Sequence, residues 1–324
     1  MIFSDFSTIF VLNEKKKQNK KDLFIAEIPY FVKKIEKMYI EQANKPLFIN
    51  VNGDLMDLHT PRVMGILNVT PDSFYAGSRY QTEKEIIERA HAIIAEGGDI
   101  IDIGAYSSRP DSVDIPEEEE FRRLESALTV LNRELPDAVL SVDTFRSEIA
   151  RRCVQDFGVA LINDISGGEI DKRMFQTVAD LHVPYILMHM KGTPQTMLQH
   201  THYEHFLEEV FFYFSQKVNE LRLLGVNDII LDPGFGFSKT LSDNYLLMRH
   251  LNDFRIFNLP LLVGISRKSM IYKYLEVSPA ESLNGTTVLN TISLMNGANF
   301  LRVHDVRQAV EAVRIVSMLE KQQD

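Results

Sequence analysis

The sequence is poor in cysteine and in long apolar runs. Cys153 is the one thiol in 324 residues, so no disulfide can form within the chain, and its neighbours predict a small core residue on a helix. No apolar run approaches the ~20 residues that a transmembrane helix needs. The apolar-leaning residues 1–12 come before the basic run Lys15–Lys21 and not after it, unlike a secretory signal. We therefore expect a cytoplasmic protein with no membrane partner.

Positive charge is also scarce. The chain has 35 Lys and Arg against 45 Asp and Glu, a formal net charge of −10. Such a balance argues against a nucleic acid as partner, because a phosphate backbone is bound mainly through cations. A phosphate-binding site in this chain would have to be a local cluster of basic residues. The 45% hydrophobic and 25% charged content is typical of a globular protein with a large core.

The most informative stretch is Val63–Phe74, with the sequence V-M-G-I-L-N-V-T-P-D-S-F. Val63 to Leu67 is a short apolar run, as expected for a strand buried on both faces. The run ends at Asn68, and the following Thr70–Ser73 cannot continue a regular element. The pattern predicts a buried strand that carries polar chemistry at its C-terminal end.

The same pattern recurs to the end of the chain. About eight strand–helix units fill roughly 260 residues, the size expected for an α/β protein of the (β/α)8 TIM barrel class. A doubly wound sheet is the competing architecture, and the lack of a G-x-G-x-x-G motif after the first strand argues against it. The predicted strands are Val63–Asn68, Asp99–Gly104, Val139–Asp143, Ala160–Asp164, Pro184–Met188, Asp228–Asp232, Pro260–Gly264 and Asn299–Val303. The predicted helices are Glu83–Glu96, Pro116–Arg133, Ser147–Asp156, Asp171–Leu181, Tyr203–Leu224, Ser242–Asn252, a helical stretch from Gly264 to Asn296, and Val306–Leu319.

Residues before the first barrel strand have a different character. Asn52-Gly53 between two apolar segments predicts a β-hairpin over Leu47–Leu58, placed to plug the bottom of the barrel. Ile28–Ile40 has apolar residues at helical spacing. We expect an N-terminal extension, 1–45, and a barrel domain, 46–324.

Polar residues gather where the predicted strands end. In a barrel these ends meet at the C-terminal face, where active sites lie. A single such residue is most often a turn former or a helix cap, but a whole set at successive strand ends indicates a site. The residues are Asn68, Asp102, Asp143, Asn163, Asp164, His189, Asp232, Ser266, Lys268, Arg302 and His304.

On these residues the chain resembles the dihydropteroate synthase family over about Leu47–Leu319. Nine stretches match in order, each at a strand end. They are Met64–Phe74, Asp99–Gly104, Ser107–Pro110, Ser141–Thr144, Ile162–Gly168, Met188–Pro194, Leu231–Phe237, Gly264–Ser269 and Arg302–Val306. The resemblance implies a pterin-binding barrel that joins (7,8-dihydropterin-6-yl)methyl diphosphate to 4-aminobenzoate in folate biosynthesis, with Mg²⁺ as cofactor. It also implies a homodimer formed through the last helices.

The resemblance further implies a role for each site residue. The pterin would be bound by Asp143, Asn163, Asp232 and Lys268. The diphosphate would be bound by Asn68, Arg302 and His304, with Asn68 also a metal ligand. The aminobenzoate would lie near Ser108, Arg109, Pro110, Phe237 and Ser266. Asp143, Lys268, Arg302 and His304 would be catalytic.

Three positions depart from the family pattern. Tyr106 stands where the family usually has Glu, and Asp111 where it usually has Gly. Both flank the loop after the second barrel strand, which the aminobenzoate would contact. Ser238 replaces a common Gly after Phe237.

Three other functions compete with this one. A methyltransferase barrel would share the Asp and Asn strand ends but would not need the basic residues at Lys268 and Arg302. A metal-dependent hydrolase is suggested by His200, His202 and His205, although these precede a helix and are expected to face solvent. A pterin-binding module without catalysis would not require the full set of charged residues.

Overall fold

The computed structural model describes residues 47–70, 83–108 and 114–320. The predicted helix Ile28–Ile40 and the predicted site residues Arg109 and Pro110 lie outside these ranges. The division into an extension over 1–45 and a domain over 46–324 therefore stays a prediction.

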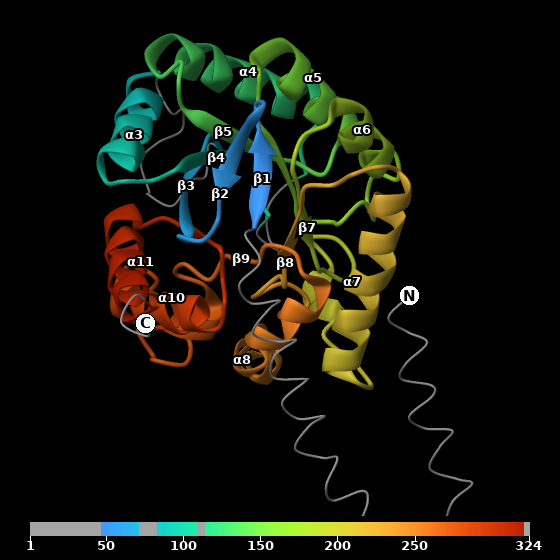
Figure 1. The fold of residues 1–324 in the computed structure, drawn as a ribbon, viewed down its shortest axis with the longest axis vertical. Helices are drawn as coiled ribbons and strands as arrows, with labels where there is room; N and C mark the ends of the chain where they lie inside the picture. The colour runs from blue at the N-terminus through green and yellow to red at the C-terminus, as the bar shows by residue number, and fades with distance from the viewer. Residues whose placement is uncertain (1–46, 71–82, 109–113, 321–324) are drawn as a thin grey trace, which may run out of the picture. The chain divides into compact units, whose positions relative to one another are not determined.

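Eight parallel strands form a barrel (Figure 1). They lie in the order β8-β7-β6-β5-β4-β3-β10-β9, and a parallel bridge between Leu231 and Leu261 joins the two outer strands. This closure confirms the barrel and excludes the doubly wound sheet. The strands are β3 (Arg62–Asn68), β4 (Ile100–Gly104), β5 (Val139–Asp143), β6 (Leu161–Asp164), β7 (Tyr185–Met188), β8 (Ile229–Asp232), β9 (Leu262–Val263) and β10 (Phe300–Val303).

Helices cover the outside of the barrel (Figure 1). They are α3 (Glu83–Ala95), α4 (Glu117–Glu134), α5 (Ser147–Phe157), α6 (Met174–Leu181), α7 (Phe206–Leu223), α8 (Leu241–Arg249), α9 (Ser269–Tyr272), α10 (Leu283–Met295) and α11 (Val306–Glu320), with 3₁₀ turns at Met197–Gln199 and Leu251–Phe257. The predicted stretch from Gly264 to Asn296 is divided into α9 and α10. Glu276 has a left-handed backbone (φ 55°) and Pro279 has no amide hydrogen, so one helix cannot pass through both. None of the helices in the described ranges has the length and apolar character to cross a membrane.

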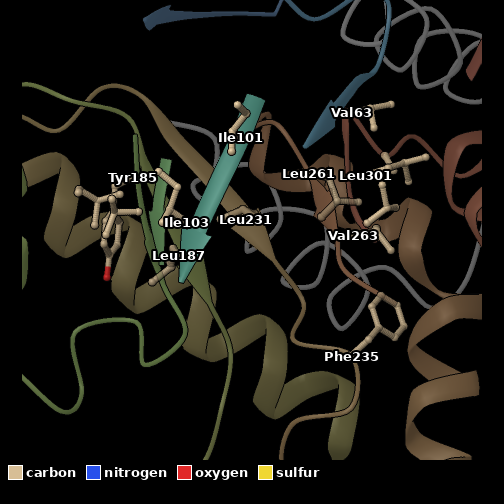
Figure 2. Packing of buried hydrophobic residues seen from close by; sticks show 14 of the residues in the cluster. Val63, Ile101, Ile103, Tyr185, Leu187, Leu231, Phe235, Leu261, Val263 and Leu301 are labelled. Carbon is tan, nitrogen blue, oxygen red and sulfur yellow. The ribbon is translucent and has the colours of Figure 1, made fainter. Parts of the chain in front are cut away.

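The main core lies between the strands and the helices. Side chains that point outward from the barrel, such as Val63, Ile101 and Leu187, are buried there against helix residues (Figure 2). Figure 2 shows Val263 and Leu301 side by side, as their pairing in register requires. Cys153 is buried in the same layer, as its neighbours in the sequence predict. Because this core is built from the outward-facing side chains, the side chains that point into the barrel can be polar near the C-terminal ends of the strands.

The barrel interior is apolar at its N-terminal end. The hairpin strands β1 (Phe48–Val51) and β2 (Asp54–Asp57) are paired antiparallel, with Asn52 and Gly53 both at positive φ, as predicted. Ile49 and Val51 of the hairpin pack with inward-facing residues from the starts of the barrel strands. The hairpin therefore closes the bottom of the barrel and leaves the other end for the site.

Candidate active site

The polar ends of the strands converge at the C-terminal mouth of the barrel. A Cβ atom added to Gly264 would lie 3.8 Å from Cβ of Arg302 and 4.0 Å from Oδ2 of Asp232. Two residues that are 70 positions apart in the chain thus face the same small space. The structure brings together the charged residues that the sequence predicts, while their individual roles remain predictions.

Arg302 is the electrostatic centre of this mouth. Its Nε donates to Oδ2 of Asp102 at 2.6 Å, and its Nη2 donates to Oδ2 of Asp143 at 2.7 Å. Burial disfavours the charge of Arg302, but the two carboxylates more than offset that cost and raise its pKa. Arg302 is therefore a permanent cation fixed between β4 and β5.

Asp102 also orients two neutral side chains. Ser141 donates its hydroxyl to Oδ1 of Asp102 at 2.6 Å, and the Asn163 amide donates to Oδ2 at 3.1 Å. Asp102 and Ser141 are fully buried. Such a satisfied network fixes the Asn163 amide, so its donor and acceptor have set directions for a ring with several heteroatoms.

Asp143 and Asp232 are carboxylates held in a poorly hydrated space. Burial raises the pKa of Asp143 to about 7, even though Arg302 favours its charged form. Burial also raises the pKa of Asp232, against the attraction of Lys268. Each carboxylate is thus costly to keep charged without a ligand, and a cationic or hydrogen-bond-donating ligand would favour the charged form.

Lys268 completes the charged set beside Asp232. Its ammonium donates to the backbone carbonyl of Phe235 at 2.6 Å and lies 4.5 Å from the centre of the Phe237 ring. Burial lowers the pKa of Lys268 to about 8, although the Asp232 carboxylate works in the opposite direction. A buried lysine with such a pKa is a good donor to a ligand oxygen or nitrogen.

His304 lies on the same side of the mouth as Arg302. Its ring Nδ1 and its backbone amide are both 3.1 Å from the hydroxyl oxygen of Ser266. Burial lowers the pKa of His304 to about 4, so the ring is neutral at pH 7. Ser266, predicted to contact the aminobenzoate, therefore orients His304 in this structure.

Asn68 fits the part of a magnesium ligand. Asn68 is half-buried at the end of β3, and its Oδ1 lies 3.2 Å from where a Cβ on Gly104 would be, so a side chain at position 104 would crowd the amide oxygen. The described ranges contain no group of three or more His, Cys, Asp or Glu able to hold a metal. Mg²⁺ commonly uses one or two protein ligands and completes its shell with substrate phosphates and water. The residues present suit a Mg²⁺ ion that arrives with a diphosphate.

Other predicted residues lie around this centre. Ser108 follows β4 and is half-buried, and Phe237 is buried beside Lys268. Tyr106 accepts a hydrogen bond from Gln195 at 2.5 Å and packs edge-on against Phe145. The family-atypical tyrosine therefore joins the loop after β4 to the loop after β7.

The three histidines near α7 form no metal site. His200, His202 and His205 are exposed, as expected from their place before a helix, and they are not part of any potential metal group within 47–70, 83–108 and 114–320. The observation that favoured a metal-dependent hydrolase is thus removed.

Comparison with known proteins agrees with this geometry. The profile of the family "Pterin binding enzyme" matches residues 64–304. The dihydropteroate synthase of Escherichia coli (strain K12) is 40% identical over 266 residues, 82% of this chain and 93% of that protein. The chain belongs to the dihydropteroate synthase family.

Two solved family members share the fold. The Yersinia pestis dihydropteroate synthase, in a complex with a sulfonamide drug, has a TM-score of 0.80 and 36% identity, over 85% of this chain and all of that one. The Thermus thermophilus dihydropteroate synthase, in complex with 4-aminobenzoate, has a TM-score of 0.75 and 35% identity, over 84% of this chain and all of that one.

Four buried residues of this family member receive no individual role from the sequence, although Asp102 and His189 are among the strand-end residues that it indicates. Asp102 holds Arg302 and Asn163, and Ser141 donates to Asp102. Lys239 and His189 contact each other beside the loop after β8. A signal for Asp102 was available, since it is a lone carboxylate between isoleucines of a buried strand. Lys239 gave no such signal, because a lysine just before a helix is usually exposed.

Proposed function

We infer that this chain is a transferase that joins 4-aminobenzoate to (7,8-dihydropterin-6-yl)methyl diphosphate and releases 7,8-dihydropteroate and diphosphate. The observation that carries this inference is the pairing of two buried carboxylates with two cations in the mouth of a family-typical barrel. The ring of a pterin needs carboxylate and amide partners, and a diphosphate needs cations. Both sets meet here.

The carboxylate side of the mouth suits the pterin. Asp232 can accept a pair of hydrogen bonds from the amidine-like edge of the ring. Gly234 already donates its amide to Oδ1 of Asp232 at 2.8 Å, which sets the direction of the other oxygen. Asn163, oriented by Asp102, supplies a donor and an acceptor to the other heteroatoms. Lys268 can donate to the ring from the side of Phe237.

The basic residues of the same mouth suit the diphosphate. Arg302 is a permanent cation there, and the neutral His304 ring can donate a hydrogen bond to a phosphate oxygen. Asn68 would hold Mg²⁺ through its amide oxygen. When bound, this ion would neutralise charge on the diphosphate and so make it a better leaving group.

The residues support a mechanism in which diphosphate leaves before the amine attacks. The bond between the methylene carbon and the diphosphate oxygen breaks, and positive charge spreads from the methylene carbon into the pterin ring. Asp143 would stabilise that charge through its carboxylate, while Arg302 and His304 would stabilise the departing anion. The aromatic amine then forms the new carbon–nitrogen bond and loses a proton to solvent. No strong base is required, because an aromatic amine is already a nucleophile.

A turnover assay tests this function directly. Purified protein, Mg²⁺ and pterin diphosphate should release diphosphate rapidly when 4-aminobenzoate is present, and dihydropteroate should accumulate in equal amount. A methyltransferase barrel or a binding module without catalysis would release none. Pterin binding without 4-aminobenzoate-dependent turnover would overturn the proposal.

We also propose a homodimer through α10 and α11. These adjacent helices leave large apolar side chains exposed: Met295 is 63% exposed, Ile315 63% and Met318 57%. A patch of this kind on two neighbouring helices is typical of an interface between copies. The cytoplasmic location expected from the sequence also stays a proposal.

A further inference from the structure

We propose that Lys239 is a positioning residue that fixes the loop over residues 233–238, and through it the Asp232 carboxylate and the Lys268 ammonium. This inference rests on the proposed reaction only for its kinetic test. The loop follows β8 and carries the backbone groups that contact both of these site residues. Lys239 directly follows this loop and contacts it from a buried position.

Lys239 is a buried cation surrounded by oxygen acceptors. Its side chain is 6% exposed. The ammonium donates to the carbonyls of Gly234 at 2.9 Å, Phe237 at 3.0 Å and His189 at 3.2 Å, and lies 3.0 Å from Nδ1 of His189. Two of these carbonyls belong to the loop, and the third follows β7. One side chain thus connects both ends of the loop to the neighbouring strand.

Close packing shows that the loop has little freedom against this lysine. Gly234 has φ +72°, and a Cβ there would lie 2.1 Å from the carbonyl oxygen of His189 and 3.2 Å from Nζ of Lys239. Gly236 has φ +80°, and a Cβ there would lie 3.1 Å from Cδ of Lys268. The loop is therefore held between two lysines, one that directly follows it and one in the site.

A shift of the loop over residues 233–238 would reach the site through its backbone groups. The Gly234 amide donates to Oδ1 of Asp232, so a shift of Gly234 would turn the carboxylate. The Phe235 carbonyl accepts from Lys268 while its ring is fully buried in the core, beside the strand residues shown in Figure 2. A loop held only by Phe235 could still rotate about that anchor. Lys239 holds carbonyls on both sides of Phe235, and Asn244 adds one bond by accepting from the Gly236 amide at 2.6 Å.

Lys239 is a costly cation whose donors are fully used. Burial lowers the pKa of Lys239 to about 7, so keeping an ammonium here is costly, and the carbonyls of His189, Gly234 and Phe237 offset that cost. His189 is held neutral, since burial lowers its pKa well below the usual value, and its ring can accept from the ammonium. The Lys239 ammonium thus orders the carbonyls of Gly234 and Phe237, in the same loop whose backbone contacts Asp232 and Lys268.

The test compares Lys239→Met with a matched control. Val218→Ala removes apolar contacts of α7 from the core, away from the loop. Lys239→Met should raise KM for pterin diphosphate about tenfold or more. KM for 4-aminobenzoate should rise less, because Phe237 is the residue of this loop predicted to lie near that substrate. Backbone amides of residues 233–238 should exchange hydrogen faster, while those of β1 and β2 should not change. Val218→Ala should lower Tm without changing either KM.

Equal increases in both KM values, or an unchanged pterin KM with unchanged exchange in 233–238, would overturn the proposal. Should Lys239→Met fail to fold, Lys239→Gln keeps two of the three N–H donors without the charge and should show the same selectivity with a smaller change. A Gln variant that matches the wild type in both KM and exchange would equally overturn it. The exchange measurement needs no turnover, so its result is independent of whether the proposed reaction is correct.

Discussion

Two opposing influences act on the charge of Asp143, namely its burial and its ion pair with Arg302. It is paired with Arg302 at 2.7 Å, yet burial raises its pKa to about 7. The carboxylate is therefore held near the pH at which its charge is lost. A cation that develops next to it gains more than it would beside a carboxylate in water, because the surroundings screen the attraction less.

Replacing Asp143 with Asn should slow the chemical step more than it weakens pterin binding. The amide keeps the shape and can still accept from Arg302, but it cannot stabilise a positive ring. We expect kcat to fall about a hundredfold, with pterin affinity changed by only about threefold. Rapid-quench measurement of diphosphate release, with a separate binding titration, checks both numbers. An unchanged rate of release would remove Asp143 from the mechanism.

The pH profile of kcat/KM provides an independent check on the same carboxylate. Because the raised pKa of Asp143 is about 7, lowering the pH through 7 protonates it, and kcat/KM should fall. The pKa of Lys268 is about 8, so raising the pH through 8 removes its charge and should reduce kcat/KM again. Asp143→Asn should lose the acid limb and keep the alkaline one. A variant with both limbs intact would assign the acid limb to another group.

Ser238 shows how a family-atypical residue is accommodated. Its backbone has φ 46°, a left-handed value that explains why glycine is common here. Its hydroxyl oxygen accepts from the Lys191 amide at 2.9 Å. Ser238→Ala keeps the backbone strain and loses the hydrogen bond, so we expect a loss of about 1 to 2 kcal/mol in the free energy of unfolding. Ser238→Gly should lose less, because it relieves the strain. Urea denaturation of both variants measures the difference, and a Gly variant less stable than the Ala variant would contradict this account.

At the scale of elements, the ends of the strands matter more than the strands themselves. β4, β5 and β10 contribute Asp102, Asp143 and Arg302 to one network because parallel strands in a barrel end at the same face. The loops differ in how they are held. The loop after β8 is fixed by buried hydrogen bonds, whereas the loops after β4 and β7 are joined through the Tyr106–Gln195 contact.

The exposed faces of α10 and α11 lead to a prediction about assembly. The double substitution Ile315→Glu and Met318→Glu puts two charges into the proposed interface and should convert a dimer into a monomer. Light scattering after size-exclusion chromatography measures the mass. Leu223→Glu, a change at an exposed residue of α7, is the matched control and should leave the mass unchanged. A wild-type protein that is monomeric at micromolar concentration would refute the dimer.

In the whole molecule, the two ends of the barrel have different roles: apolar packing at the N-terminal end stabilises the fold, and charged residues at the C-terminal end form the site. The N-terminal end is closed by the hairpin and filled with apolar residues, and the C-terminal end carries the charges. Stability should therefore not depend on Mg²⁺. Chelation with EDTA should abolish turnover, and added Mg²⁺ should restore it. Tm without substrate should stay the same, because the described ranges contain no cluster of metal-ligating side chains. A large drop in Tm on chelation would indicate a structural metal.

The sequence alone determined the architecture and which polar residues end the barrel strands. Alternating apolar runs and helix patterns specify a (β/α)8 barrel, since only strands buried on both faces are so uniformly apolar. Residues that end those strands, such as Asn68, Asp232 and Arg302, must then meet at one face. The boundary between α9 and α10 escaped prediction, because a left-handed residue at Glu276 leaves no mark in the apolar pattern.

Only the tertiary structure decided which residues pair and which are neutral. The contact of Arg302 with Asp102 joins positions 200 residues apart, and no spacing rule in the sequence predicts it. The neutral state of His304 follows from its burial, which no local pattern reveals. Lys239 is the clearest case, since its burial and the carbonyls that pair with its ammonium both arise only in the folded protein. Local sequence fixes where a side chain leaves the backbone, but desolvation and pairing depend on what the rest of the chain places beside it.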